Sequence, residues 1–139
     1  MELVGLDHVQ LAMPFGEEDA ARRFYAGILG LTEVAKPAAL SGRGGCWFVG
    51  TSTHVHLGVE PEFRPAAKAH PAFLVPDIEK ARQSLAQAGI EIVDEDSLDV
   101  ERFYANDPFG NRLEFVAVSD RGFSDPAVAR DLRSADRTS

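Results

Sequence analysis

Apolar and polar residues alternate over several short stretches in the first half of the chain, a pattern typical of half-buried strands. It predicts four strands, at residues 3–12, 31–35, 45–50 and 53–59. Between the first two, residues 17–29 carry apolar positions at helical spacing, with Phe24, Tyr25 and Ile28 on one face. Gly30 follows as a C-terminal stop, because glycine readily adopts the left-handed conformation that ends many helices.

The second half of the chain shows the same order of patterns. Strands are predicted at residues 69–75, 90–94, 100–105 and 111–118. A helix over residues 78–88 begins after Asp77, whose side chain is a good N-cap, and ends at Gly89. The stretch 106–111 is rich in residues that favour tight turns, so it should join the last two strands.

Both halves therefore have the order β-α-β-β-β. Their matching positions, Asp7-His8 with Ala69-His70, Gly30 with Gly89 and Val34 with Val93, are 59 to 62 residues apart. Self-similarity at a nearly fixed offset indicates a duplicated unit. We predict a single α+β domain over residues 1–139, with modules at about 3–60 and 68–118 and a polar tail at 119–139. The two modules would form one curled mixed sheet around a cavity, with the helices outside.

Composition narrows the possible partners and location. The chain has 139 residues, 45% of them apolar, which is enough for one domain with a real core. The net charge of −8 disfavours nucleic acid and membranes as partners, because like charges repel. The sequence shows neither a signal peptide nor an apolar run near the roughly 20 residues that span a bilayer. Cys46 is the only cysteine, which fits a reducing compartment, so we expect a cytoplasmic protein.

The polar faces of the predicted strands carry the candidate chemistry. Strand alternation separates the apolar residues from a polar set that comprises His8, Gln10, His54, His56, His70, Arg102, Tyr104, Arg112 and Glu114. With a single cysteine, a metal could be held only by histidine and carboxylate ligands. Two histidines and one carboxylate suit divalent Fe, Zn, Ni, Mn or Co and leave positions open for a substrate.

Each of these residues also has a purely structural interpretation. A strand histidine is commonly a hydrogen-bonded or surface residue, and Glu114 alone could be a solvated one. The metal hypothesis is favoured because His8 and His70 occupy matching positions of the repeat. His56 matches Glu114 and could be a further ligand, whereas His54 is interpreted as a surface or rim residue. Other residues are assigned mainly to packing: Cys46 as a small buried hydrophobe, and Trp47, Phe48 and Phe103 as core or the wall of an apolar pocket.

Three features together resemble the vicinal-oxygen-chelate superfamily: the paired modules, Asp7-His8-Val9, and the stretches FYAGILGL (24–31) and YANDPFGNRLEF (104–115). That superfamily includes glyoxalase I, fosfomycin-resistance thiol transferases, extradiol dioxygenases, methylmalonyl-CoA epimerase and metal-free bleomycin-binding proteins. The resemblance covers about residues 3–118.

The resemblance implies a ligand set and a dimer. It puts His8, His70 and Glu114 in metal-ligand positions, and His56 where glyoxalase I usually has a glutamate. Tyr104 matches a substrate-side tyrosine of the fosfomycin-resistance transferases. However, residues 81–139 contain no lysine for a phosphonate contact, which disfavours fosfomycin as the substrate. Members of this size are usually homodimers, and in some of them the first-half histidine joins the second-half ligands across the interface.

Several functions remain open at this point. The leading one is a metal-dependent, glyoxalase-like lyase or isomerase for a small oxygen-chelating substrate, with Glu114 or His56 as the base. The alternatives are an extradiol-type Fe(II) dioxygenase, a thiol transferase, and a metal-free protein that binds drugs or other small molecules. In each case Gln10, Trp47, Arg102 and Tyr104 are the candidate substrate-binding residues.

Overall fold

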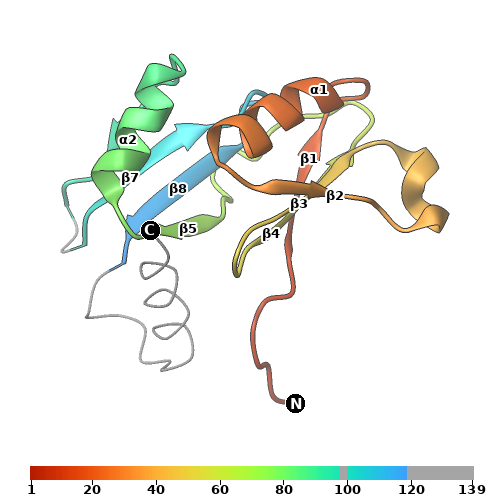
Figure 1. Ribbon diagram of the computed structural model, residues 1–139, viewed down its shortest axis with the longest axis horizontal. Coiled ribbons are helices and arrows are strands. Elements are labelled where there is room, and N and C mark those ends of the chain that lie inside the picture. Colours follow the sequence, from red (N-terminus) through yellow and green to blue (C-terminus); the bar gives the residue numbers. More distant parts are fainter. Residues whose placement is uncertain (98–99, 119–139) are drawn as a thin grey trace.

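The computed structural model describes residues 1–97 and 100–118, which form two four-stranded sheets lying side by side (Figure 1). The first sheet contains β1 (Val9–Met13), β2 (Thr32–Val34), β3 (Cys46–Val49) and β4 (His54–Val59) in the order β1-β4-β3-β2. The second contains β5 (Ala72–Val75), β6 (Val93–Asp94), β7 (Arg102–Asn106) and β8 (Arg112–Ala117) in the order β5-β8-β7-β6.

The two sheets have the same connections, which confirms the predicted repeat of two β-α-β-β-β modules. In each sheet the first strand is parallel to the last, and the remaining pairs are antiparallel. The strands do not join into one curled sheet in the described part of the chain. Each module forms its own open four-stranded sheet, and β1 and β5 are edge strands of these sheets.

One helix follows the first strand of each module. The first begins as α1 (Glu18–Ala21) and continues as the wider π-helix η1 (Arg22–Ile28), and the second is α2 (Ile78–Gln87). A short 3-10 helix, η2 (Ala38–Arg43), lies between β2 and β3. The predicted N-cap is confirmed, since the Asp77 carboxylate accepts a hydrogen bond from the Lys80 backbone N–H at 3.0 Å. The predicted stops are confirmed as well, with φ of +73° at Gly30 and +75° at Gly89.

Each helix packs on the apolar face of its own sheet. The core residues of the first module are Met13, Ala21, Phe24, Tyr25, Cys46, Phe48, Val55 and Leu57, and those of the second are Ile78, Leu85, Phe103, Ala105, Leu113 and Phe115. Cys46 is therefore a packed residue, as predicted, and burial raises the pKa of its thiol to about 11. A thiol held in its neutral form is a poor nucleophile.

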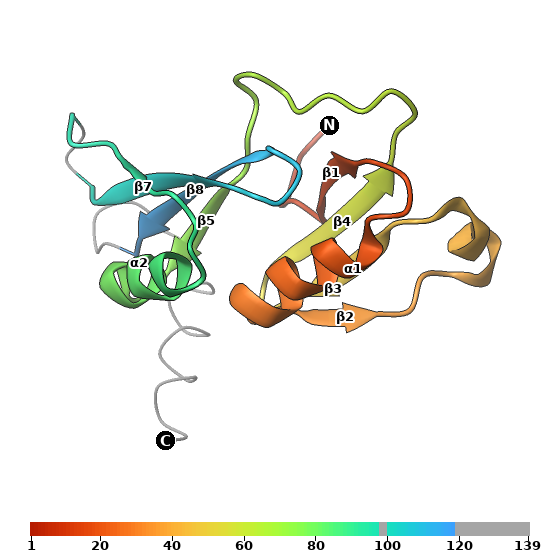
Figure 2. The same cartoon turned by 90° about the horizontal axis from the view of Figure 1, so that it is seen from above.

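The turn between β7 and β8 also joins the two modules (Figure 2). Within the turn, one carboxylate oxygen of Asp107 accepts hydrogen bonds from the backbone N–H groups of Phe109 and Asn111, both at 2.9 Å. Its other oxygen accepts the Tyr25 hydroxyl at 2.8 Å, and the Asn111 amide donates to the carbonyl of Ala12 at 2.8 Å. The tight turn predicted at 106–111 is confirmed, and its contacts with β1 and η1 hold the modules together.

The predicted strands at 3–12 and 69–75 begin later than expected, at Val9 and Ala72. Val9 pairs with Val55 near the start of β4, so the preceding residues extend beyond the end of that partner strand. Residues 1–7 project away from the sheet as an N-terminal arm (Figure 1). Its apolar side chains are almost fully exposed, at 87% for Leu3, 95% for Val4 and 94% for Leu6.

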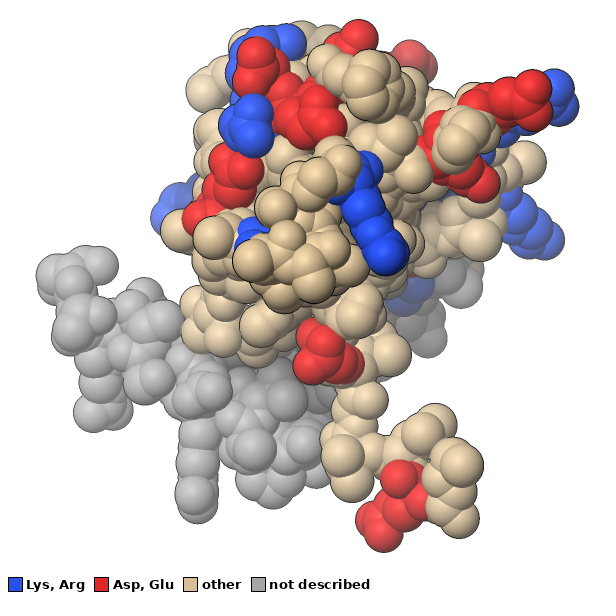
Figure 3. Space-filling view, turned by 90° about the vertical axis from the view of Figure 1, so that its right-hand side faces the viewer, with Lys and Arg blue, Asp and Glu red and all other residues tan. Residues whose placement is uncertain are grey.

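The surface of the first module carries both signs of charge. Figure 3 shows lysine and arginine side chains interspersed with aspartate and glutamate over this side of the molecule. Among residues 1–97 and 100–118, no helix is both long enough and apolar enough to cross a membrane.

Candidate functional site

The polar residues that the sequence indicated lie on the sheet faces opposite the helices. In β4, Val55 and Leu57 are core residues, so the alternating His54 and His56 point to the other face. In β8, Leu113 and Phe115 are core residues and Glu114 points to the other face. We call these two surfaces the open faces of the first and second sheets.

A stack of three rings forms the centre of the open face of the first sheet. Trp47 and His56 are direct neighbours across β3 and β4, with ring centroids 3.8 Å apart and planes 4° from parallel. His8 covers the other side of His56, with centroids 4.0 Å apart and an angle of 17°. Trp47 is therefore not a core residue, since the alternation of β3 places its neighbours Cys46 and Phe48 in the core instead.

Hydrogen bonding orients the His8 ring. Its Nδ1 lies 2.7 Å from a carboxylate oxygen of Asp7, which can only accept, so Nδ1 carries a proton. This hydrogen bond, together with the nearby charge of His8, lowers the pKa of the Asp7 carboxyl. Burial, and then the charge of His8, lower the pKa of His56.

Glu114 is the centre of the open face of the second sheet. Its side chain is only 9% exposed, and its two oxygens have different partners. Oε1 accepts a hydrogen bond from Nη1 of Arg102 at 2.8 Å, and Oε2 lies 3.0 Å from Nε2 of His70. The carboxylate therefore lies between a guanidinium group and an imidazole.

A hydrogen bond at the other ring nitrogen of His70 determines how its contact with Glu114 is interpreted. Nδ1 of His70 lies 2.6 Å from the backbone carbonyl of Lys68, which can only accept, so Nδ1 carries a proton. In a neutral ring, Nε2 would then direct its lone pair at the carboxylate, and two acceptors would meet at 3.0 Å. A proton shared between these two atoms, or a cation bound by both, makes this contact favourable.

Two further side chains flank His70 and Glu114. The Tyr104 ring meets the His70 ring edge to face, with centroids 5.5 Å apart. The Arg112 guanidinium carbon lies 4.0 Å from the centre of the Tyr104 ring, a cation–π arrangement. Among the predicted substrate-binding residues, Arg102 and Tyr104 thus adjoin Glu114, whereas Gln10 and Trp47 adjoin His56.

The structure brings the predicted ligands together in two pairs rather than in one group. His70 contacts Glu114, and His8 contacts His56. Across the described ranges, no three His, Cys, Asp or Glu side chains lie close enough to hold one metal ion. His54 is exposed at the start of β4, in keeping with the surface role predicted for it.

Sequence reasoning missed three contacts that shape these faces. The carboxylate of Asp7 orients His8, although the motif Asp7-His8 already contained that signal. The backbone carbonyl of Lys68 orients His70, and no side-chain pattern could have predicted it. Arg102 was assigned to substrate but also binds Glu114, because the register of β7 and β8 brings both side chains to one face.

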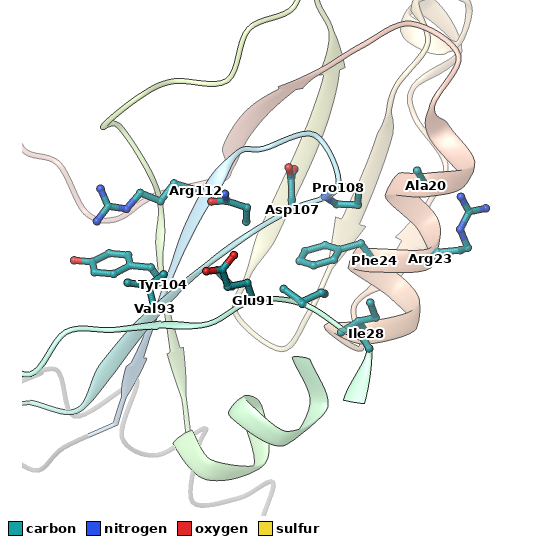
Figure 4. Close-up of a pocket in the computed structure, with 14 residues that line it drawn as sticks. Ala20, Arg23, Phe24, Ile28, Glu91, Val93, Tyr104, Asp107, Pro108 and Arg112 are labelled. Carbon is teal, nitrogen blue, oxygen red and sulfur yellow. The ribbon is translucent and has the colours of Figure 1, made fainter. Parts of the chain in front are cut away.

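A cavity of about 800 Å³ lies between the two modules, and Tyr104 and Arg112, which flank His70, are among its lining residues (Figure 4). Its walls come from the first helix and from the segment around β6, β7 and the following turn. They are lined mainly by Ala20, Phe24, Ile28, Ala88, Ile90, Val93, Ala105 and Pro108. Glu91 and Asp107 supply carboxylates, although Asp107 is already hydrogen-bonded within the protein.

Comparison with known proteins identifies the family. Residues 5–115 match the Glyoxalase/Bleomycin resistance protein/Dioxygenase superfamily. The chain therefore belongs to this superfamily, as the sequence motifs indicated. A search of curated proteins gave no significant match.

Solved structures agree with that membership. A glyoxalase family protein from Bacillus anthracis is 48% identical, with a TM-score of 0.82, and the alignment covers 86% of this chain and 98% of the other. A glyoxalase/dioxygenase from Nostoc punctiforme is 26% identical, with a TM-score of 0.64 and coverage of 80% and 90%. A fosfomycin resistance protein from Listeria monocytogenes is 14% identical, with a TM-score of 0.68 and coverage of 86% and 97%, so it shares the fold alone.

Proposed function

We propose that the protein is a metal-dependent enzyme, a glyoxalase-like lyase or isomerase that acts on a small oxygen-chelating substrate. The contact between Nε2 of His70 and Oε2 of Glu114 is the observation that carries this proposal. It directs two good metal donors toward each other, while Nδ1 of the histidine is held by a backbone carbonyl. Metal-bound histidines typically have such an acceptor on their second nitrogen.

The donor set fits a divalent first-row ion. His8 repeats the arrangement of His70, with Nδ1 held by Asp7 and Nε2 free to bind. His8, His70 and Glu114 together would provide two imidazoles and one carboxylate, a set that accepts Fe, Zn, Ni, Mn or Co. This set is also the reason to keep an extradiol-type Fe(II) dioxygenase as the second candidate.

We propose that the three ligands come together in a homodimer. His8 of one chain would join His70 and Glu114 of the other, which would also close the two modules into a curled sheet around the substrate. The open edges of β1 and β5 support this arrangement, as does the exposure of Leu3, Val4 and Leu6 in the N-terminal arm. Apolar side chains of that kind are normally covered by a partner.

The chain's own residues would bind and orient the substrate. A bound divalent ion would act as a Lewis acid that stabilises an oxyanion on the substrate. Gln10 and Trp47 on one face, with Arg102 and Tyr104 on the other, would contact the substrate, and the arginine favours a carboxylate or phenolate group. Glu114 would move the proton, with His56 as the alternative base, because its lowered pKa keeps the ring neutral near pH 7.

Metal analysis of the purified protein tests this proposal. We expect one divalent ion per chain by inductively coupled plasma mass spectrometry, and its loss in His8→Ala and in Glu114→Gln. His54→Ala is the matched control, because His54 is an exposed histidine on the same strand as His56. If wild-type protein binds none of the five ions after loading, the metal hypothesis is wrong. A small-molecule-binding protein that uses the 800 Å³ cavity would then be the better explanation.

Mixing two variants tests the proposed dimer. His8→Ala and Glu114→Gln each lack one ligand, but a heterodimer of the two has one complete shared site. Unfolding and refolding them together should restore about a quarter of the wild-type metal content, because half of the dimers are mixed and each has one intact site of two. No recovery would mean that the ligands come from a single chain.

A further inference from the structure

The ring stack on the open face of the first sheet gives His56 a role that differs from that of a metal ligand. His56 occupies the position of Glu114 in the repeat, yet its ring lies between two other rings rather than toward a charged group. Trp47 covers one face of the imidazole and His8 covers the other. The orientation of His56 is thus determined on both sides.

The stack prevents His8 and His56 from binding the same ion. An imidazole nitrogen binds a metal in the plane of its ring, at about 2.0–2.1 Å. The two rings are nearly parallel, 17° apart, with centroids separated by 4.0 Å. An ion in the plane of His8 therefore lies well outside the plane of His56 and beyond bonding distance of its nitrogens.

We propose that His56 is a positioning residue that fixes the plane of the His8 imidazole and does not itself bind the ion. The ion belongs to the function proposed above, on which this inference rests. His8 precedes the first residue of β1, so no strand pairing of its own holds it. Its ring is set by two contacts, the Asp7 carboxylate at Nδ1 and the flat face of His56. Together they determine where Nε2 points.

Trp47 and the strand register hold His56 in turn. Trp47 and Gln10 are its direct neighbours on β3 and β1, so His56 lies in the middle of a paired strand. The Gln10 side chain occupies the space above Gly58, where a Cβ atom would come within 2.6 Å of its amide nitrogen. Gln10 is thereby kept beside the stack. The sheet and Trp47 therefore hold the His56 ring in place, and the His56 ring in turn orients the His8 ring.

Two substitutions of His56 test the proposal, one that keeps a flat aromatic ring and one that removes it. His56→Phe keeps a flat ring for the stack but has no metal donor, whereas His56→Ala removes both. Metal affinity is measured by isothermal titration with Ni²⁺ and with Zn²⁺, and His54→Ala is again the control. We expect His56→Phe to bind within about threefold of wild type, because aromatic stacking is retained. His56→Ala should bind about 10- to 100-fold more weakly, the usual loss when a residue that orients a ligand is removed.

Trp47 provides a second measurement that is independent of activity. It is the only tryptophan of the chain and lies one ring away from His8. Binding of Ni²⁺ should quench its fluorescence in wild type and in His56→Phe. In metal-free protein, the carbon-bound ring protons of His8 should show a ring-current shift in NMR spectra that His56→Phe keeps and His56→Ala loses.

The outcomes separate this inference from the proposed function. Loss of metal binding in His56→Phe equal to that in His8→Ala would mean that His56 is a ligand, and would overturn the inference alone. Wild-type affinity in a folded His56→Ala, checked by circular dichroism, would also overturn it, because the stack would then have no effect on His8. Absence of metal binding in wild type would overturn the proposed function and the inference with it.

Discussion

The open faces of the two sheets share one backbone plan but use it differently. At matching positions of the register, the first face has Gln10, His56 and Trp47, and the second has Ala72, Glu114 and Tyr104. The first set stacks Trp47 and His56, with His8 on the other side of His56, whereas the second surrounds a carboxylate with Arg102 and His70.

The comparison shows which part of a duplicated unit is free to diverge. The core faces of both modules must remain apolar, because each packs under its own helix. The open faces are under no such constraint, so one module can specialise in orienting a ligand and the other in supplying charge. His8 and His70 are the exception, since an acceptor occupies Nδ1 in both rings.

Asp107→Ala should have the largest effect on stability, because the turn between β7 and β8 reaches across to the first module. Asp107 is 5% exposed and accepts hydrogen bonds from Tyr25, Asn111 and Phe109. Its removal leaves several buried donors without a partner, which should cost about 3–4 kcal/mol of unfolding free energy. Urea denaturation measures this loss, with the exposed Asp96→Ala as control. Equal midpoints for the two variants would mean that the turn does not join the modules.

Asp7→Ala and Lys68→Ala compare how the two histidines are oriented. Asp7 uses its side chain, whereas Lys68 uses its backbone carbonyl, which the substitution leaves in place. We expect Asp7→Ala to weaken metal binding about 10- to 100-fold and Lys68→Ala to change it less than about twofold. Isothermal titration with Zn²⁺ distinguishes them. A similar loss in both variants would contradict the distinction between side-chain and backbone acceptors.

Tyr25→Phe should have a smaller effect on the junction between the modules. Burial, and then the charge of Asp107, raise the pKa of the Tyr25 hydroxyl well above its usual value, so it acts only as a donor. The variant removes that single donor and leaves the other hydrogen bonds of Asp107 intact. Thermal unfolding should report a loss of about 1.5 kcal/mol. A loss as large as that of Asp107→Ala would place the whole stabilisation in this one hydrogen bond.

The Cys46 thiol should react slowly with alkylating reagents in the native protein, because it lies on the core face of β3. With a buried thiol whose pKa is about 11, it should resist iodoacetamide at pH 8 in native protein. Mass spectrometry should find one adduct per chain once urea unfolds the protein. Rapid labelling of the native form would show that the first module opens locally, and that its core is less stable than this packing implies.

The sequence by itself determined the modules, the faces and the superfamily. Alternation with a period of two assigned Phe103 and Leu113 to the core and Tyr104 and Glu114 to the other face. This works because successive side chains of a strand point to opposite faces of the sheet. The N-cap at Asp77 and the stops at Gly30 and Gly89 were equally predictable, because local backbone chemistry decides them.

Only the tertiary structure decided which polar groups meet. Periodicity gives the face of a side chain but not its neighbours, so it could not show that His56 stacks between Trp47 and His8 or that Arg102 binds Glu114. It also extended the first strand to residue 3, whereas pairing begins at Val9, because a strand needs a partner as well as a pattern. Contacts of this kind depend on strand order and register, which are properties of the folded sheet and not of any one segment.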